Sequence, residues 1–359
     1  MCNEAGMTLY SDLKIFHFPQ KIDNLGHDMP VTAPVHIRLK PTNKCNHRCR
    51  YCAYRSSDLQ LGKDMRIADT IPQGKMFEIC KDIVAMGVKA VTFSGGGEPL
   101  MYPYLLEGAR ILKEGGVRLA CLTNGALLQG DVARFFSQNA AWIRISMDGW
   151  DDASYRRYRG IGDGEYSKIM RNLLAFSALG GDCVLGVSYI IDAENYTHIP
   201  EVLRRYKDIG VRSVKLSACI TSNDAERANE YHAPHFHYVQ DAIRQSQELF
   251  ADQSFEIVDA WHAMDARFHK DYDWCPYSQI LTVIGADLGI YPCQDKAYND
   301  EALLGSLRGQ RLREWWFENK DAFFKIHPNV HCRHHCVANG KNMMLHEYLS
   351  LVEGHTEFV

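Results

Sequence analysis

Short apolar runs alternate with segments of helical spacing along most of this chain. Six runs have the pattern of buried strands, and each ends at a polar or Gly-rich turn: residues 35–40, 90–95, 117–124, 142–149, 183–192 and 213–218. Apolar residues recur at helical spacing in six further segments: 74–87, 104–114, 129–138, 165–179, 197–209 and 231–250. Because crossovers between parallel strands are right-handed, we expect an α/β fold, a partial (β/α)6 TIM-like barrel with its helices outside.

The alternation of strands and helices stops near residue 255, and the chain beyond is rich in cysteine, histidine and tryptophan. We therefore expect an N-terminal segment over residues 1–34, the barrel over 35–254, and a small C-terminal module over 255–359.

Composition narrows the class of protein and its partners. The chain has 359 residues, of which 46% are hydrophobic and 23% charged, as in ordinary globular proteins. A formal net charge of -4 shows no global basic field, so we expect no nucleic acid and no membrane partner. No apolar stretch approaches the roughly 18 residues of a membrane span, and acidic residues stand where an export signal needs basic ones. We expect a cytoplasmic protein that acts on a small molecule or a peptide.

Three cysteines follow the first predicted strand at the spacing Cys-x3-Cys-x2-Cys: Cys45, Cys49 and Cys52. Three soft thiolates on one loop suit an iron–sulfur cluster better than a hard cation. No fourth cysteine lies between them, so one iron of a 4Fe-4S cluster would be open to another ligand. A structural zinc site is the alternative, with His47 as the local fourth ligand.

Polar and glycine residues also follow the next three strands, where barrel enzymes place their chemistry. Ser94 to Pro99 follow the second strand, Thr123 to Gly125 follow the third, and Ser146 to Gly149 close the fourth. Glycines allow the backbone to approach a ligand closely, although a Gly-rich run is also an ordinary turn.

These motifs together resemble the radical S-adenosylmethionine (SAM) superfamily. The resemblance rests on the cysteine spacing, with an aromatic residue just before the last cysteine, and on FSGGGEPL (93–100), which is similar to the family's SAM-binding turn. It implies that SAM is bound by Tyr51, Gly96, Gly97, Glu98 and Pro99.

Two later motifs extend the resemblance. ISMDG (145–149) is similar to the family's fourth-strand motif, which implies that Ser146 and Asp148 lie near the ribose or the methionyl group. YRG (158–160) offers Arg159 for the SAM carboxylate, and a surface arginine is the alternative. Thr123 and Asn124 in LTNG are further SAM-binding candidates, although Asn-Gly is also a common turn.

For the reaction, the resemblance implies that the open iron chelates SAM. An external one-electron reductant, such as flavodoxin or ferredoxin, would reduce the cluster. Cleavage of SAM would then yield a 5′-deoxyadenosyl radical that abstracts hydrogen from the substrate.

A second group of cysteines lies in the C-terminal module: Cys275, Cys293, Cys332 and Cys336. Four thiolates can close a second cluster, and a zinc site, alone or with His331, His334 or His335, is the alternative. The flanking pattern resembles the SPASM and Twitch auxiliary modules, and four cysteines fit the Twitch form with one auxiliary 4Fe-4S cluster. A fully liganded cluster would transfer electrons, which suits a net oxidation.

The remaining cysteines are unclustered, and such residues are usually buried. Cys219 ends the sixth strand, where its thiol could return a hydrogen atom to a substrate radical, but core packing is the favoured interpretation. We expect a radical SAM oxidoreductase that acts on a small polar, sugar-like substrate. The alternatives are a peptide-modifying radical SAM enzyme, which would oxidise, crosslink or epimerise, and a non-catalytic iron–sulfur or zinc protein.

Overall fold

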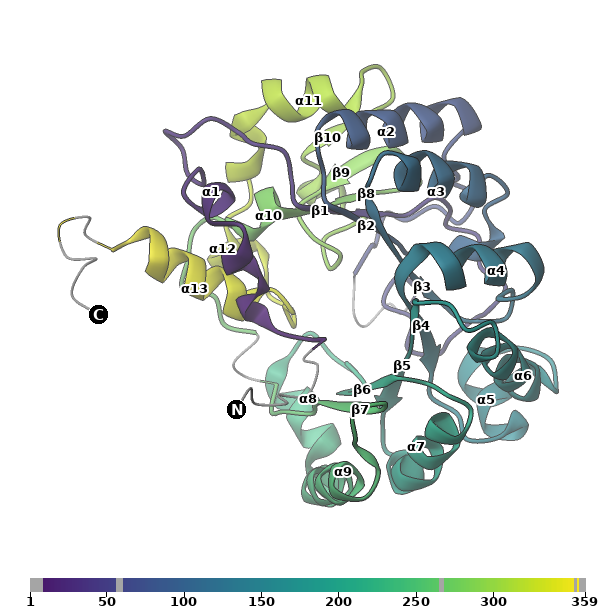
Figure 1. Cartoon of the computed structure of the whole chain (residues 1–359). Helices are drawn as coiled ribbons and strands as arrows, with labels where there is room; N and C mark the ends of the chain where they lie inside the picture. The colour runs from purple at the N-terminus through teal and green to yellow at the C-terminus, as the bar shows by residue number, and fades with distance from the viewer. Residues whose placement is uncertain (1–8, 56–60, 265–267, 352–353, 355–359) are drawn as a thin grey trace, which may run out of the picture.

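The computed structural model describes residues 9–55, 61–264, 268–351 and 354, so Cys2 lies outside the described residues. Its strands form one curved sheet, in the order β10-β9-β8-β1-β2-β3-β4-β5-β6-β7 (Figure 1). The strands are β1 (His36–Leu39), β2 (Ala90–Phe93), β3 (Arg118–Thr123), β4 (Ala140–Met147), β5 (Val184–Ile191), β6 (Ser213–Ala218), β7 (Glu256–Ala260), β8 (Leu281–Ile284), β9 (Gly289–Tyr291) and β10 (Gly305–Ser306).

The six predicted strands are all present, as β1 to β6, and each pairs in parallel with the next. Helices cover the convex side of the sheet (Figure 1). This arrangement confirms an α/β fold that is consistent with a partial TIM-like barrel. The covering helices are α2 (Gln73–Ala85), α3 (Leu105–Glu114), α4 (Gly130–Asn139), α5 (Asp152–Arg159), α6 (Glu165–Ser177), α7 (Ile199–Asp208) and α9 (Phe236–Phe250).

Two helical regions differ from the prediction. Helix α5 was not expected, because its residues are strongly polar, but Asp151 and Ser154 form a capping box that begins it. The segment expected as one helix over 231–250 is divided into α8 (Ala225–His232), a 3-10 turn at Ala233–His235 and α9. Pro234 lies in that turn, where it cannot donate a backbone hydrogen bond.

Four strands lie beyond the six that were predicted. β7 pairs in parallel with β6, and β8 pairs in parallel with β1, so residues after 254 extend both ends of the same sheet. β9 and β10 continue the β8 end as antiparallel strands. These strands are only two to five residues long, too short for a clear periodic signal. The boundaries of a separate C-terminal module remain a prediction.

The two faces of the barrel strands differ in burial. Ile37, Ile143 and Val214 are fully buried on the helix side. The alternating positions face the barrel interior, and several of them are polar and only half-buried: Arg38, Arg144, Ser146, Ser188, Lys215 and Ser217. The interior of a TIM barrel is usually a packed apolar core. Here several interior side chains are polar and keep part of their surface exposed.

The two ends of the described chain meet at the open side of the barrel, where α1 (Pro19–Ile22) lies near α13 (Asn339–Leu349) (Figure 1). Ile15, Ile22 and Leu345 share a small apolar cluster with Ile280 of α10 (Tyr277–Ile280). The chain ends also include α11 (Leu312–Glu318) and α12 (Pro328–His331). No helix in the described ranges is both long and apolar enough to cross a bilayer.

Candidate SAM and iron–sulfur sites

The first cysteine loop lies at the carboxyl end of β1 and is held by the end of α5. The backbone N–H groups of Arg48 and Arg50 donate to the carbonyls of Arg159 and Tyr158, at 2.7 and 3.0 Å. Gly160 ends α5 in the left-handed region, with φ of 58°. A Cβ there would press on the carbonyl of Arg48 at 2.9 Å, so glycine permits this close approach.

Arg50 fixes the other side of the same loop. Its guanidinium donates to Asp192 and Glu194, each at 2.5 Å, just after β5. The guanidinium also stacks over the ring of Tyr158, 4.1 Å from the centroid. The loop is therefore anchored both to the end of α5 and to the turn that follows β5.

The three cysteines of this loop are free and half-buried. Burial raises the pKa of Cys45 to about 11, and the neighbouring Cys49 raises it further. Burial also raises the pKa of Cys49, with a contribution from Cys52, while Arg159 opposes it. The thiols are thus close enough to influence one another, as ligands of one cluster must be. Their chemistry and placement fit a 4Fe-4S cluster, although no group of three or more Cys, His, Asp or Glu in the described part of the chain is arranged around a single metal ion.

His47, the alternative zinc ligand, is buried between Tyr155 and Glu165. Its Nε2 atom lies 3.7 Å from a Glu165 carboxylate oxygen. Burial, with help from Arg159 and Lys168, lowers the pKa of His47 to about 3, so the ring is neutral at pH 7. Among the described residues, neither ring nitrogen makes a hydrogen bond.

The glycine-rich turn after β2 packs directly on the chain that leads into the cysteine loop. Gly97 donates to the carbonyl of Thr42 at 3.2 Å, and the backbone of Glu98 donates to that of Lys44 at 2.9 Å. A Cβ on Gly97 would collide with the backbone of Asn43 and Lys44. The glycines therefore allow two backbone segments to meet, and this contact sets the position of the turn beside the cysteines.

The Glu98 side chain is turned into the protein. It is 3% exposed and accepts hydrogen bonds from Thr123 Oγ1 at 2.5 Å, from the backbone of Asn124 at 2.8 Å and from that of Leu100 at 3.1 Å. Burial raises its pKa to about 7, while these hydrogen bonds lower it. Pro99 begins a 3-10 turn, Pro99–Met101, directly after it. The Glu98 carboxylate thus ties the glycine turn to the end of β3.

Asn124 continues this connection into the cysteine loop. Its side-chain amide donates to Asn46 Oδ1 at 2.8 Å, and its own Oδ1 accepts from the backbone of Ala126 at 3.0 Å. Thr123 and Asn124 therefore hold the turn and the loop in register, through contacts within the protein.

Arg159 joins three parts of the site. Its Nε donates to Asp148 Oδ1 at 3.0 Å, Nη2 to the carbonyl of Ser146 at 2.8 Å, and Nη1 to the Cys49 sulfur at 3.4 Å. Asp148 is fully buried, and its second oxygen, Oδ2, has no partner among the described residues. Burial raises the pKa of Asp148 although Arg159 lowers it.

Tyr51 packs beside this group. Its ring lies 5.8 Å below the Arg159 guanidinium, and its buried hydroxyl has no hydrogen-bond partner within the described ranges. Arg159 is thus a buried residue and not the surface arginine of the alternative interpretation, and three of its N–H groups are engaged inside the protein.

The four C-terminal cysteines lie near enough to one another to interact electrostatically. Burial raises the pKa of Cys293 well above its usual range, and Cys336, Cys332 and Cys275 each raise it further. The α13 residue Asn342 donates to the Cys275 sulfur at 3.3 Å and accepts from the backbone of Tyr277 at 3.0 Å. Four neighbouring thiols with a hydrogen-bonding amide behind them fit either a cluster or a closed zinc site.

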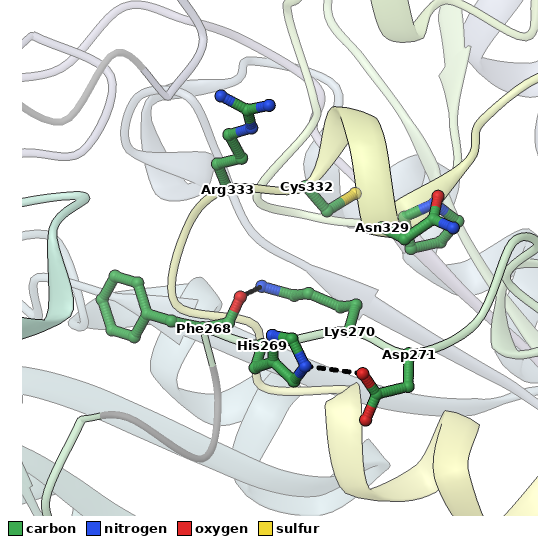
Figure 2. Close-up of a pocket in the computed structure, with 8 residues that line it drawn as sticks. Phe268, His269, Lys270, Asp271, Asn329, Cys332 and Arg333 are labelled. Carbon is green, nitrogen blue, oxygen red and sulfur yellow. Dashed lines mark hydrogen bonds and ion pairs between the residues drawn. The ribbon is translucent and has the colours of Figure 1, made fainter.

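A cavity of about 460 Å³ opens beside this group, lined by Cys332, Lys270 and Arg333 among others (Figure 2). Lys270 is buried and donates to the carbonyl of Phe268 at 2.9 Å and to that of His334. His269 and Asp271 form an exposed ion pair at 2.6 Å on the rim.

Cys219 ends β6 at the same end of the barrel as the cysteine loop. It is 5% exposed, and burial raises its pKa to about 12, so it carries a neutral thiol at pH 7. Its carbonyl lies 2.8 Å from His232 Nε2.

Two interior cations were not considered from the sequence. Arg38 and Lys40 occupy alternate positions of β1 and of its continuation, on the face opposite Ile37 and Leu39. Lys40 is fully buried, donates to Tyr54 Oη and Gly95 O, and interacts electrostatically with both Cys52 and Cys293. Two charged residues at alternate positions of a predicted buried strand were the signal in the sequence.

Comparison with known protein families places the first site in context. Residues 39–206 match the family model of the radical SAM superfamily. Among curated proteins, the chain is 26% identical over 176 residues to a GTP 3′,8-cyclase of Rhizobium leguminosarum bv. trifolii, which covers 48% of each chain. It is also 26% identical over 162 residues to the Fe-coproporphyrin III synthase of Methanosarcina barkeri, covering 45% of this chain and 38% of that protein. The chain thus spans about half or less of these relatives.

Solved structures share the fold over a longer part of the chain. SuiB of Streptococcus suis bound to precursor peptide SuiA aligns with a TM-score of 0.59 at 15% identity, covering 89% of this chain and 73% of that one. Native anSMEcpe with bound AdoMet aligns with a TM-score of 0.59 at 18% identity, covering 81% and 83%.

Proposed function

We propose that this chain, whose residues 39–206 belong to the radical SAM superfamily, is an enzyme that abstracts hydrogen from a small polar substrate. The family implies SAM and a 4Fe-4S cluster as cofactors. The observation that carries the proposal is the cysteine loop at the end of β1, held beside the glycine turn and the Asp148–Arg159 pair.

In this proposal Cys45, Cys49 and Cys52 hold the cluster, which when bound and reduced supplies the electron that cleaves SAM. The carbonyls of Gly96 and Gly97 accept hydrogen bonds from the methionyl amino group. Ser146 lies on the interior face, where its half-buried hydroxyl can reach the ribose. The polar barrel interior then holds the substrate against SAM and limits its contact with water.

Formation of 5′-deoxyadenosine tests this function. Anaerobically reconstituted protein, with dithionite as reductant, is expected to convert SAM to 5′-deoxyadenosine. Cys45→Ala should abolish that conversion. Cys183→Ala is the matched control, because Cys183 is a buried cysteine at the start of β5 and lies outside the loop. Equal cleavage by the wild type and Cys45→Ala would overturn the proposal.

For the second cysteine group we propose that Cys275, Cys293, Cys332 and Cys336 hold an auxiliary 4Fe-4S cluster, which when bound would supply electron transfer suited to a net oxidation. Support comes from the mutual influence of the four thiols and from the Asn342 contact to Cys275. The reconstituted chain should hold about eight iron atoms, and Cys293→Ala about four. One zinc ion per chain with about four irons would favour the closed zinc site.

A peptide substrate is the second candidate, because SuiB, which shares this fold, has been solved with a precursor peptide. A third candidate reaction is cyclisation of the substrate, because several similar proteins are named GTP 3′,8-cyclase. Product mass separates oxidation from cyclisation, whether the substrate is a small molecule or a peptide. Oxidation by loss of two hydrogens lowers the substrate mass by about 2 Da, whereas a cyclisation that is an isomerisation leaves the mass unchanged.

A further inference from the structure

We propose that the barrel interior binds an anionic group of the substrate, a phosphate or a carboxylate, through Arg38 and Lys40. The inference rests on the proposed function, since it assigns a chemical class to the substrate of the same barrel.

Both cations are fixed by the backbone of β1. Arg38 is paired with Thr92 of β2 and with Val283 of β8, so it lies on a strand with neighbours on both sides. The backbone of Lys40 donates to Ile284 at 2.9 Å and continues this ladder. Two residues along a strand span roughly 7 Å. Lys40 is therefore at the level of the glycine turn, and Arg38 is one layer deeper in the barrel.

Neither side chain forms an ion pair with a carboxylate among the described residues, and both interact electrostatically with Asp295. Arg38 makes no hydrogen bond or ion pair within the described ranges, and its Nε atom is buried and unpartnered. Lys40 donates only to a phenol and a peptide carbonyl, Tyr54 Oη and Gly95 O. A buried cation without a carboxylate destabilises the empty protein, and an anion bound between the two would remove that cost.

A third cation adds to the positive charge of the barrel interior. Arg144 of β4 faces the same interior, interacts electrostatically with Arg38, and has a buried Nε without a partner among the described residues. Tyr10, from the N-terminal segment, accepts a hydrogen bond from the Arg144 guanidinium. His36, one layer below Arg38, adds no charge, because burial lowers its pKa to about 3.

Two carboxylates lie near these three basic side chains. Glu256 is engaged by the backbone of Leu9 at 3.3 Å and by Ser213 Oγ at 3.4 Å. Asp295 interacts electrostatically with Arg38 and Lys40, and burial raises its pKa to about 6. Arg38, Lys40 and Arg144 outnumber these two carboxylates. Burial lowers the pKa of Lys40 to about 7, and a bound anion would favour the charged form of this side chain.

Calorimetric titration tests which kind of anion binds. Inorganic phosphate and acetate are titrated separately into the reconstituted full chain in the presence of saturating SAM. SAM is present so that its own site is filled. We expect binding of one anion per chain, weakened at least tenfold by Arg38→Met or Lys40→Met. Lys113→Met is the matched control, because Lys113 is an exposed lysine on the outer helix α3, and it should bind as the wild type does. Tighter phosphate indicates a phosphorylated substrate, and tighter acetate a carboxylic acid.

The inference is overturned if the wild type binds neither anion, or if both variants bind as the wild type does. Arg38→Lys keeps the charge and should restore part of the affinity, which separates loss of the site from loss of the fold. Cleavage of SAM is measured on the same wild-type sample. Cleavage without anion binding refutes only this inference, and absence of cleavage refutes the proposed function.

Discussion

Arg159→Met is expected to destabilise the protein strongly, because it leaves the fully buried Asp148 carboxylate without its partner. Removal of one member of a buried ion pair typically costs about 3 to 5 kcal/mol. Asp148→Asn should also destabilise, since it leaves the Arg159 guanidinium, which is 3% exposed, without its carboxylate.

The distance between the Arg159 and Asp148 side chains sets the size of their interaction energy. Unit charges 3.0 Å apart attract by about 5.5 kcal/mol at an effective dielectric constant of about 20. Burial already raises the pKa of Asp148, so the unpaired carboxyl can take up a proton, which limits the loss. We therefore expect the two losses in unfolding free energy not to add. The double variant should lose at least about 2 kcal/mol less than the sum of the losses in the two single variants.

Anaerobic urea unfolding of the two single variants and the double variant measures these free energies. Arg157→Met is the control on the same helix, since the Arg157 side chain is 56% exposed and lies 3.9 Å from Glu194. Its unfolding free energy should stay within about 0.5 kcal/mol of the wild type. Additivity of the Arg159 and Asp148 losses within about 0.5 kcal/mol would refute the reasoning.

Three further outcomes are expected. Gly97→Ala should lower stability by about 1 to 3 kcal/mol, because its Cβ meets backbone, while Gly74→Ala, with nothing within 4 Å, should not, as melting temperatures will show. The raised pKa of Glu98, about 7 against 4.5, means that its contribution to stability is full below about pH 4.5 and is lost as the pH rises through 7. Relative to Glu98→Gln, the wild type should therefore lose up to about 3 kcal/mol between pH 4.5 and 8 in urea unfolding, and parallel profiles would contradict this. Trp316→Ala, at a fully buried side chain, should cost about 3 to 5 kcal/mol, whereas Phe317→Ala, 45% exposed, should cost less than 1 by the same measurement.

Strands with strong local patterns were predictable. Each of the six predicted runs is a strand. Continuous or alternating apolar residues favour a strand with a buried face, and this local signal does not depend on distant parts of the chain. The strands after residue 254 were missed for the converse reason. β8 has only four residues and is a strand because it pairs with β1, about 240 residues earlier in the chain.

The candidate site shows the same division. The spacing of Cys45, Cys49 and Cys52 was sufficient to predict one loop with three thiols, because neighbours in sequence stay neighbours in space. The role of Glu98 was not visible, since its partners, Thr123 and Asn124, are more than twenty residues away. The assignment of individual side chains to SAM remains a prediction.

The sequence by itself determined the βα alternation, the cysteine loop and the glycine turn that follows β2, since each depends on residues close together in the chain. Only the tertiary structure decided that Arg159 bridges Asp148 and Cys49 and that Arg38 and Lys40 face the barrel interior. It also decided that four cysteines far apart in the chain lie near enough to interact electrostatically. These features depend on which strand ends come together and on what burial does to a charge. Local sequence does not specify either, because it carries no information on long-range neighbours or on exclusion of water.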